Sequence, residues 1–154
     1  MLDLKIERTT APKEKPTDET KLGFGHIFTD HMFVMNYDTG MGWHDARIVP
    51  FGNITLSPAA MCLHYGQTVF EGLKAYTTED GHIVTFRPDL NGERLESSAA
   101  RLEMPIFPKE RFVEAVTETV KANDAFVPPY GSGATLYILS LIHISEPTRP
   151  EPIS

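Results

Sequence analysis

Alternating and clustered hydrophobic residues predict paired strands in the first third of the chain. Aromatic and apolar residues crowd 28–37, alternation follows over 43–51, and a turn signal at 38–40 separates the two segments. Because side chains on a strand alternate between two faces, this pattern favours a β-hairpin. Ser57-Pro58 then resembles an N-cap followed by a first helical residue, which predicts a short helix through Leu63.

The middle and the end of the chain show both the two-residue period of strands and the 3.6-residue period of helices. Segments 70–78 and 82–87 flank an Asp-Gly pair, which predicts a second hairpin. Apolar residues recur at helical spacing over 90–102 and 109–122, and a last strand is expected over 133–138. Strands and helices are grouped rather than strictly alternating. The fold class expected is therefore α+β, a mostly antiparallel sheet with helices on one face.

The pattern divides the chain into three parts. Residues 1–22 are rich in charge and poor in aromatic side chains, so we expect a flexible N-terminal arm. Residues 23–138 form the folded domain. Residues 139–154 carry three prolines and break off the last strand, and their string LSLIHISEPTRP resembles the translated read-through of a sequencing adapter. We therefore expect a non-native tail on a truncated parent, in preference to a genuine disordered tail.

Composition narrows the function classes. The 154 residues carry a formal net charge of −7, which argues against a nucleic-acid partner because such binders need a basic surface. No apolar run approaches the ~20 residues of a membrane span, and no apolar segment typical of a secretion signal opens the chain. A single cysteine, Cys62, excludes an intramolecular disulfide. We expect a cytoplasmic protein with no membrane partner.

Generic catalytic and metal motifs are absent from the sequence. It contains neither a phosphate-cradling GxxxxGK[ST] loop nor a GxSxG elbow. His26 and His31 are five residues apart and would point to opposite faces of a strand, so no metal site is expected. We interpret Cys62 as a small buried apolar residue rather than a nucleophile. Glu71 could act as a general acid or base, but an ordinary buried or capping carboxylate is the simpler interpretation.

Arg87 is the one residue that suggests a ligand. It ends an apolar strand and precedes Pro88, a placement suited to holding an anion such as a phosphate. A salt bridge with a nearby carboxylate explains the same placement. Phe24, Tyr65 and Phe70 lie beside glycines, where backbone can approach a ligand closely, although core packing explains them equally well.

Four strings together carry a resemblance to a known family. They are GFGHIFTDHMF (23–33), LHYGQTVFEGLKAY (63–76), FRPDLNGERLESSAARLEMP (86–105) and GATLYI (133–138). In this order, over roughly 22–138, they resemble the N-terminal part of branched-chain amino-acid aminotransferases. The resemblance implies the small α+β domain of a fold-type IV enzyme that depends on pyridoxal 5′-phosphate and works as a homodimer or larger assembly.

The resemblance also implies an activity and its ligands. Amino groups would pass reversibly between leucine, isoleucine or valine and 2-oxoglutarate, as in branched-chain amino-acid biosynthesis, and the cofactor would supply the electron sink. By motif, Arg87 matches the arginine that binds the cofactor phosphate. Phe24, Tyr65, Phe70 and Tyr137 match residues that line the pocket for the substrate side chain.

The chain departs from the family pattern at its end. In the family, LYI is followed by Arg-Pro, whereas Leu139 and Ser140 stand here. The lysine that forms the Schiff base belongs to the large domain, so no catalytic residue is expected in this chain. Lys74 is the tempting substitute, but the pattern places it on the strand after FEG. None of the other lysines matches either: Lys5, Lys13, Lys15, Lys21, Lys109 and Lys121.

Three functions follow as alternatives. The first is an inactive fragment of a branched-chain aminotransferase. The second is a fragment of a related fold-type IV enzyme, a D-amino-acid aminotransferase or an aminodeoxychorismate lyase, although the LHYG…FEGLKAY block favours the first. The third is a non-enzymatic interaction domain.

Overall fold

Two small sheets form the framework of the protein. The computed structural model describes residues 1–144, and residues 145–154 lie outside the described part of the chain. One sheet has the strand order β1 (Lys5–Ile6), β3 (Gly42–Pro50), β2 (His31–Asp38), and the other the order β5 (Ile83–Thr85), β4 (Thr68–Thr77), β6 (Leu136–His143). Every pair is antiparallel except β1 with β3.

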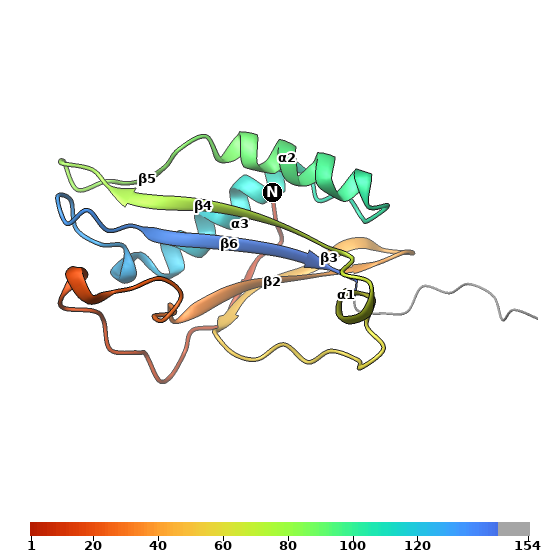
Figure 1. Ribbon diagram of the computed structural model, residues 1–154, viewed down its shortest axis with the longest axis horizontal. Coiled ribbons are helices and arrows are strands. Elements are labelled where there is room, and N and C mark those ends of the chain that lie inside the picture. The colour runs from red at the N-terminus through yellow and green to blue at the C-terminus, as the bar shows by residue number, and fades with distance from the viewer. Residues whose placement is uncertain (145–154) are drawn as a thin grey trace, which may run out of the picture.

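Two long helices pack against the sheets. They are α2 (Pro88–Arg101) and α3 (Lys109–Ala122); shorter elements are α1 (Met61–His64) and the 3₁₀ turns η1 (Glu19–Lys21) and η2 (Asp124–Phe126). Helix α2 packs on β4 of the second sheet, and α3 packs on α2 and on β2 of the first sheet. Figure 1 shows α2 along β4, with α3 behind β4 and β6. The helices approach closely because Gly92 has no side chain: a Cβ there would lie 2.8 Å from Cβ of Lys109.

The core lies between the sheets and these two helices. Leu73 and Val69 of β4 meet Leu95 of α2 and Phe112 of α3, and each is at least nine-tenths buried. Burying a large apolar side chain contributes roughly 1.5–3 kcal/mol, so this cluster is the main source of stability. The apolar residues that predicted a helix over 109–122, among them Phe112 and Val116, belong to this cluster.

The expected fold class is confirmed, with differences in the number of sheets and in element ends. Helices and antiparallel strands make an α+β fold, but the strands form two sheets rather than one. Helix α1 begins at Met61 rather than at Pro58, because Ser57 closes a turn by accepting the Ala59 N–H at 3.2 Å. Strand β6 runs on to His143, beyond the expected end at 138.

The N-terminal segment differs from the flexible arm expected over residues 1–22. Leu2 is buried in the core and donates its N–H to Glu114 at 2.8 Å, and β1 pairs with β3. Further along, the Lys15 ammonium lies 2.7 Å from the Asp30 carboxylate. Sequence polarity missed these contacts because their partners are distant in the chain.

The expected tail over 139–154 falls into two parts. Residues up to 144 lie in or directly after β6, where 139–143 pair with β4. Residues 145–154 lie outside the described part of the chain. A non-native origin for this segment stays a prediction.

No helix within residues 1–144 is long and apolar enough to cross a membrane. The same residues contain no group of three or more side chains arranged to hold a metal ion.

Candidate functional site

Strand β4 has two faces of opposite character. Val69, Glu71, Leu73 and Ala75 are buried against the helices, whereas the alternate residues face outward. Among these, Phe70 is 67% exposed. Phe70 lies beside Leu139 and Leu141 of the paired strand β6, which are 61% and 54% exposed. A contiguous exposed apolar patch of this kind is typical of a ligand or interaction surface.

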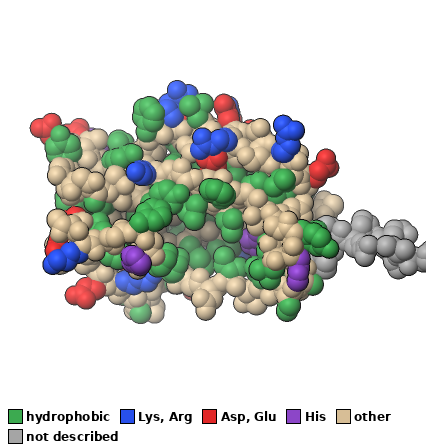
Figure 2. Space-filling view, viewed as in Figure 1, with side chains coloured by type: hydrophobic (Ala, Val, Ile, Leu, Met, Phe, Trp, Pro, Cys, Tyr) green, Lys and Arg blue, Asp and Glu red, His purple; other side chains and the backbone are tan. Residues whose placement is uncertain are grey.

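Tyr137 and Phe24 form an aromatic pair on this outer face. Tyr137 lies opposite Lys74 in the pairing of β4 with β6, and its ring meets that of Phe24 edge to face at 5.2 Å between centroids. The ring of Tyr137 also covers Gly72, where any side chain would collide with it. Figure 2 shows hydrophobic side chains gathered across the middle of this face.

The glycine of the FEG string therefore has a physical role. Residue 72 must lack a side chain so that Tyr137 can lie flat over the strand. Two strings far apart in the sequence, FEGLKAY and GATLYI, thus meet at one place in the fold. Spacing along the chain gives no sign of this contact.

Phe70 and Tyr65 lie outside that pair. Phe70 is opposite Leu141 on β6, on the same outer face. Tyr65 caps the C-terminal end of α1, and 78% of it is exposed. Among the described residues, no aromatic contact joins either ring to Phe24 or Tyr137. The structure thus brings two of the four predicted pocket residues into direct contact.

Arg87 stands at the N-cap of α2 in the left-handed region, with φ 47° and ψ 51°. This conformation is uncommon for a side chain other than Gly, Asn or Asp, and such strain often marks functional sites. The guanidinium holds both carboxylate oxygens of Asp89, with Nε at 3.2 Å and Nη2 at 3.0 Å. The salt bridge that the sequence left open as an alternative is therefore present.

The ion pair sets the protonation of both partners. The hydrogen bonds from Arg87 hold the pKa of the Asp89 carboxyl below its ordinary value, and Asp89 raises the pKa of Arg87. The pair lies at the surface, with about half of each side chain exposed. A doubly charged anion could therefore compete with Asp89 for the guanidinium without a large change in burial.

A second arginine on α2 was not singled out from the sequence. Arg94 grips the Glu71 carboxylate with two bonds of 2.6 Å, and the Asn91 amide donates to the same carboxylate at 2.9 Å. Glu71 is 3% exposed, so its charge is buried with partners. Glu71 thus has a charged partner, Arg94, which lies 23 residues further along the chain.

The two arginines stand at different places relative to α2. Arg87 precedes the first helical residue in the left-handed region, and Arg94 lies within the helix seven residues later. Arg94 lies beside β4, and Arg87 lies at the helix end nearer the β5 hairpin. Arg94 therefore binds a carboxylate on the buried inner face of β4, whereas Arg87 is exposed at the start of α2.

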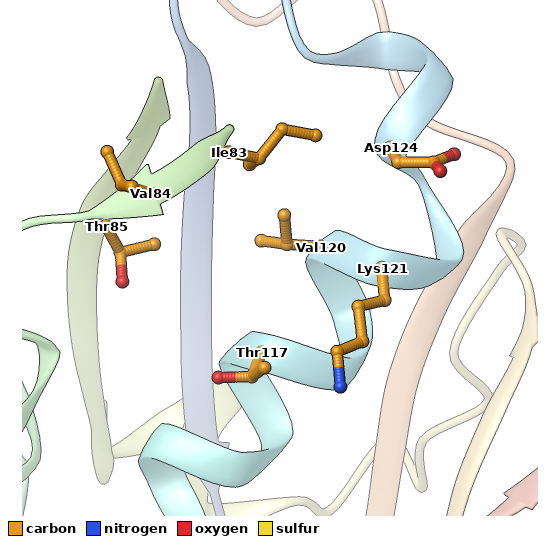
Figure 3. A pocket seen from close by; sticks show the side chains of 7 residues that line it. All are labelled: Ile83, Val84, Thr85, Thr117, Val120, Lys121 and Asp124. Carbon is orange, nitrogen blue, oxygen red and sulfur yellow. The ribbon is translucent and has the colours of Figure 1, made fainter. Parts of the chain in front are cut away.

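A separate pocket of about 290 Å³ lies between the β5 hairpin and the end of α3. Figure 3 shows Ile83 close to Val120 within it, with Lys121 and Asp124 on the helical side. Lys121 is already paired with Glu118 at 2.7 Å. The pocket contains none of the site residues predicted from the sequence.

Comparison with known proteins agrees with the motifs. No protein-family model matches the chain. A branched-chain-amino-acid transaminase of Bacillus subtilis is 48% identical over 142 residues, which cover 92% of this chain and 39% of that protein. The curated relatives in general share 42–48% identity with most of the chain. The chain thus spans about 39% of the length of such relatives.

Solved structures give the same result. The branched-chain aminotransferase of Thermoproteus uzoniensis, solved with norvaline, has a TM-score of 0.54 and 33% identity, covering 70% of this chain and 33% of its own. The enzyme of Thermobaculum terrenum in its PLP form has a TM-score of 0.50 and 28% identity, covering 62% of this chain and 29% of its own. The fold is that of part of an aminotransferase.

More particularly, most of this chain is similar to about 39% of the length of branched-chain aminotransferases. The resemblance seen in the four sequence strings is thereby confirmed.

Proposed function

We propose that this chain is part of a pyridoxal-phosphate-dependent branched-chain aminotransferase and is inactive by itself. The observation that carries the proposal is 48% identity to such an enzyme over 92% of the chain, combined with a match to 39% of that enzyme's length. The parent protein would exchange amino groups between leucine, isoleucine or valine and 2-oxoglutarate.

Pyridoxal phosphate suits the residues present. When bound, it supplies the electron sink for amino transfer. A phosphate needs cationic donors, and the Arg87 guanidinium offers its N–H groups at the surface, held by one replaceable carboxylate. We assign Arg87 to the cofactor phosphate. Arg94 is the alternative, because it is a second arginine of α2, contacts β4 through Glu71 and is itself 66% exposed.

The outer face of β4 and β6 suits a branched side chain. The rings of Phe24 and Tyr137 already meet edge to face, Tyr137 covers Gly72, and Phe70 extends the apolar surface. Tyr65, at the C-terminal end of α1, would complete the apolar wall of the proposed substrate pocket. Such a wall sorts substrates modestly, because each methylene in an apolar pocket contributes only ~1–3 kcal/mol of discrimination.

No lysine of the described chain is a good nucleophile for this reaction. Lys74 lies on the outer face, opposite Tyr137, but it is an exposed strand residue. A reactive lysine usually needs a site that lowers its pKa by burial or by a nearby cation. We infer that the catalytic amine belongs to a segment outside these 154 residues.

Assembly and location complete the proposal. We infer a homo-oligomeric parent that acts on small molecules in the cytoplasm, without nucleic-acid or membrane partners. The formal charge of −7 supports the first exclusion, since nucleic-acid binding requires basic residues. Biosynthesis of branched-chain amino acids is the role that fits this activity.

Titration of the purified chain with pyridoxal phosphate tests the phosphate assignment. Arg87→Ala should weaken binding by about tenfold, the usual effect of losing one charged hydrogen-bond partner. Arg101→Ala, on the same helix, is the control and should change nothing. If Arg94→Ala weakens binding and Arg87→Ala does not, the phosphate role belongs to Arg94.

An amino-transfer assay tests the proposed inactivity. Leucine, 2-oxoglutarate and pyridoxal phosphate should give no glutamate above the rate seen without protein. Glutamate formation proportional to the amount of the chain would show that these 154 residues hold a complete catalytic site. Activity with D-alanine instead of leucine would favour the D-amino-acid aminotransferase alternative.

A further inference from the structure

His31 is a buried histidine that the proposed function does not use. It begins strand β2, and 6% of its surface is exposed. The side chain of Asn123, after the end of α3, holds its main chain with two hydrogen bonds. Asn123 Oδ1 accepts the His31 N–H at 2.9 Å, and Asn123 Nδ2 donates to the His31 carbonyl at 3.1 Å. The backbone of His31 is therefore fixed, and the group free to respond is its imidazole ring.

The two ring nitrogens of His31 have different surroundings. Nε2 accepts the main-chain N–H of Thr9 at 3.0 Å. Nδ1 is buried and has no hydrogen-bond partner within residues 1–144. Because an amide N–H can only donate, Nε2 carries no proton while this bond exists, and the proton of the neutral ring lies on Nδ1. The contact with Thr9 thus requires one tautomer and one charge state of His31.

Protonation of the His31 ring removes this hydrogen bond. An imidazolium ring carries a proton on both nitrogens and has no acceptor. Its Nε2–H would face the Thr9 N–H, so that two donors would point at each other. Histidine ordinarily takes up this proton between about pH 5 and pH 8. The contact between Thr9 and His31 is therefore sensitive to acid in that range.

The segment that makes this contact is also held by the residue before His31. We call residues 8–15 the strap. The Lys13 N–H donates to one oxygen of the Asp30 carboxylate at 2.7 Å, and the Lys15 ammonium lies 2.7 Å from the other oxygen. The strap thus has two anchors on neighbouring residues, one an imidazole and the other a carboxylate.

The two anchors respond to different ranges of pH. The hydrogen bonds from Lys15 and Lys13 lower the pKa of the Asp30 carboxyl below 3.8, so this anchor keeps its charge in weak acid. An imidazole takes up its proton at a higher pH than a carboxyl does. Acid therefore opens the His31 anchor first and the Asp30 anchor only at much lower pH.

The charged groups around His31 leave its imidazolium form without a free partner. Asp30 precedes it and attracts a positive ring, but both oxygens of this carboxylate are already bonded by the strap. On the side of α3, Asn123 is followed by Asp124, whose carboxylate accepts the Ala125 N–H at 2.7 Å. In β3 the residue opposite is the uncharged Pro50. The strap itself carries three cations, which repel a positive ring: Arg8, Lys13 and Lys15.

We propose that His31 is a pH-sensitive anchor of the strap. A proton taken from water by Nε2 breaks the bond to the Thr9 N–H and releases this part of the strap, while the sheets and helices keep their structure. The Arg8 guanidinium, next to Thr9 in the chain, donates to the Ala122 carbonyl at 3.2 Å and should loosen with it. Acid would thus uncover the C-terminal end of α3. The inference does not rest on the proposed enzymatic function.

NMR spectroscopy of the wild-type chain tests the charge state and its consequence together. At about pH 8, the ring of His31 should be the tautomer with its proton on Nδ1. As the pH falls to about 5.5, the ring should become charged, and exchange protection of the Thr9 amide, corrected for the intrinsic rate, should fall at least about tenfold. The amides of Phe112 and Val116 should keep their protection, because the core stays closed.

His31→Gln is the variant that separates the bond from the proton. A glutamine can place its amide oxygen where Nε2 lies, and it does not titrate. Thr9 should therefore be equally protected at both pH values in this variant. His82→Gln is the matched control, because His82 is 78% exposed and lies 3.5 Å from Asp80. It should keep the pH dependence of the wild type.

Four results would overturn the proposal. They are a wild-type His31 ring with its proton on Nε2 at the higher pH, Thr9 protection that does not change with pH, an unchanged pH dependence in His31→Gln, and loss of that dependence in His82→Gln. A parallel loss of protection at Phe112 would equally overturn it, since the whole domain would then be opening. The tautomer and the titration of the wild type decide the question even if His31→Gln does not fold.

Discussion

The two faces of strand β4 differ sharply in burial. The inner face buries Val69, Glu71 and Leu73 against α2 and α3, and its one charge is fully partnered. The outer face exposes Phe70 and Lys74 around a glycine. The inner residues are buried in the core, whereas the outer aromatic residues Phe70 and Phe24 are 67% and 76% exposed.

The difference separates what builds the fold from what is left for a ligand. Buried apolar contacts on the inner face stabilise the protein whether or not a ligand binds. The outer aromatic residues keep much of their surface in water, which is the surface that the proposed ligand would cover. Gly72 contributes both to the fold and to the outer face, because it is part of strand β4 and leaves room for the Tyr137 ring.

Removing the cation from the inner face should have the largest effect. Arg94→Ala leaves the buried Glu71 carboxylate with only the Asn91 amide. Arg94 is itself 66% exposed, so we expect a loss of up to about 3 kcal/mol, the range for a buried polar group that loses its partner. Urea unfolding should show this loss. Arg101→Ala, an exposed arginine on the same helix, is the control. A loss below about 1 kcal/mol, the range of surface pairs, would contradict a structural role for the Glu71 cluster.

Filling the space between the faces should have the next largest effect. Gly72→Ala forces Tyr137 away from β4, and overpacking of this kind costs about 2 kcal/mol. Gly40→Ala is the matched control, because a Cβ at residue 40 meets no atom within 4 Å. Equal unfolding free energies for the two variants would show that the Tyr137 ring moves aside at little cost.

Truncating the outer face should change stability only slightly. A double-mutant cycle of Phe24→Ala and Tyr137→Ala should give a coupling of about 0.5 kcal/mol, at the low end for an aromatic pair because Phe24 is mostly exposed. Thermal unfolding of the four proteins measures the coupling. A coupling above about 2 kcal/mol would place the pair in the core and remove the contrast between the faces.

The smallest expected effect on folding stability is in the N-terminal segment, and it occurs only at acidic pH. Hydrogen bonds from Lys15 lower the pKa of the Asp30 carboxyl below 3.8. A lowered pKa stabilises the fold above the unfolded value of 3.8, and this contribution is lost as the pH falls through the folded pKa. Asp30→Asn should therefore flatten the fall in stability below about pH 4.

Urea unfolding between about pH 5 and pH 2 measures this effect. Glu79→Gln, an exposed carboxylate in the second hairpin, serves as the control. If wild type and Asp30→Asn lose stability in parallel over this range, the contact between Lys15 and Asp30 does not hold the segment.

Regular local patterns were the part of the fold that the sequence predicted best. Helix α3 begins and ends where its apolar stripe does, because Phe112, Val116 and Val120 all face the core. The second hairpin followed from its Asp-Gly turn. In these segments the signal and the structure are both local.

Contacts between distant segments could not be predicted in this way. Nothing in the spacing of Arg94 indicates that Glu71 lies beside it, and the packing of Leu2 depends on α3. The four aromatic residues and Arg87 were selected by their resemblance to family motifs. The structure places Phe24 on Tyr137, while the roles of all five stay predictions.

The account is tested most directly by comparing pyridoxal phosphate with pyridoxal as ligands of the wild-type chain. Calorimetric titration should show at least about tenfold tighter binding of the phosphorylated form, since one charge-assisted contact contributes roughly 1.5–3 kcal/mol. Equal dissociation constants for the two compounds, or no binding of either, would contradict the claim that this chain carries the phosphate site of an aminotransferase.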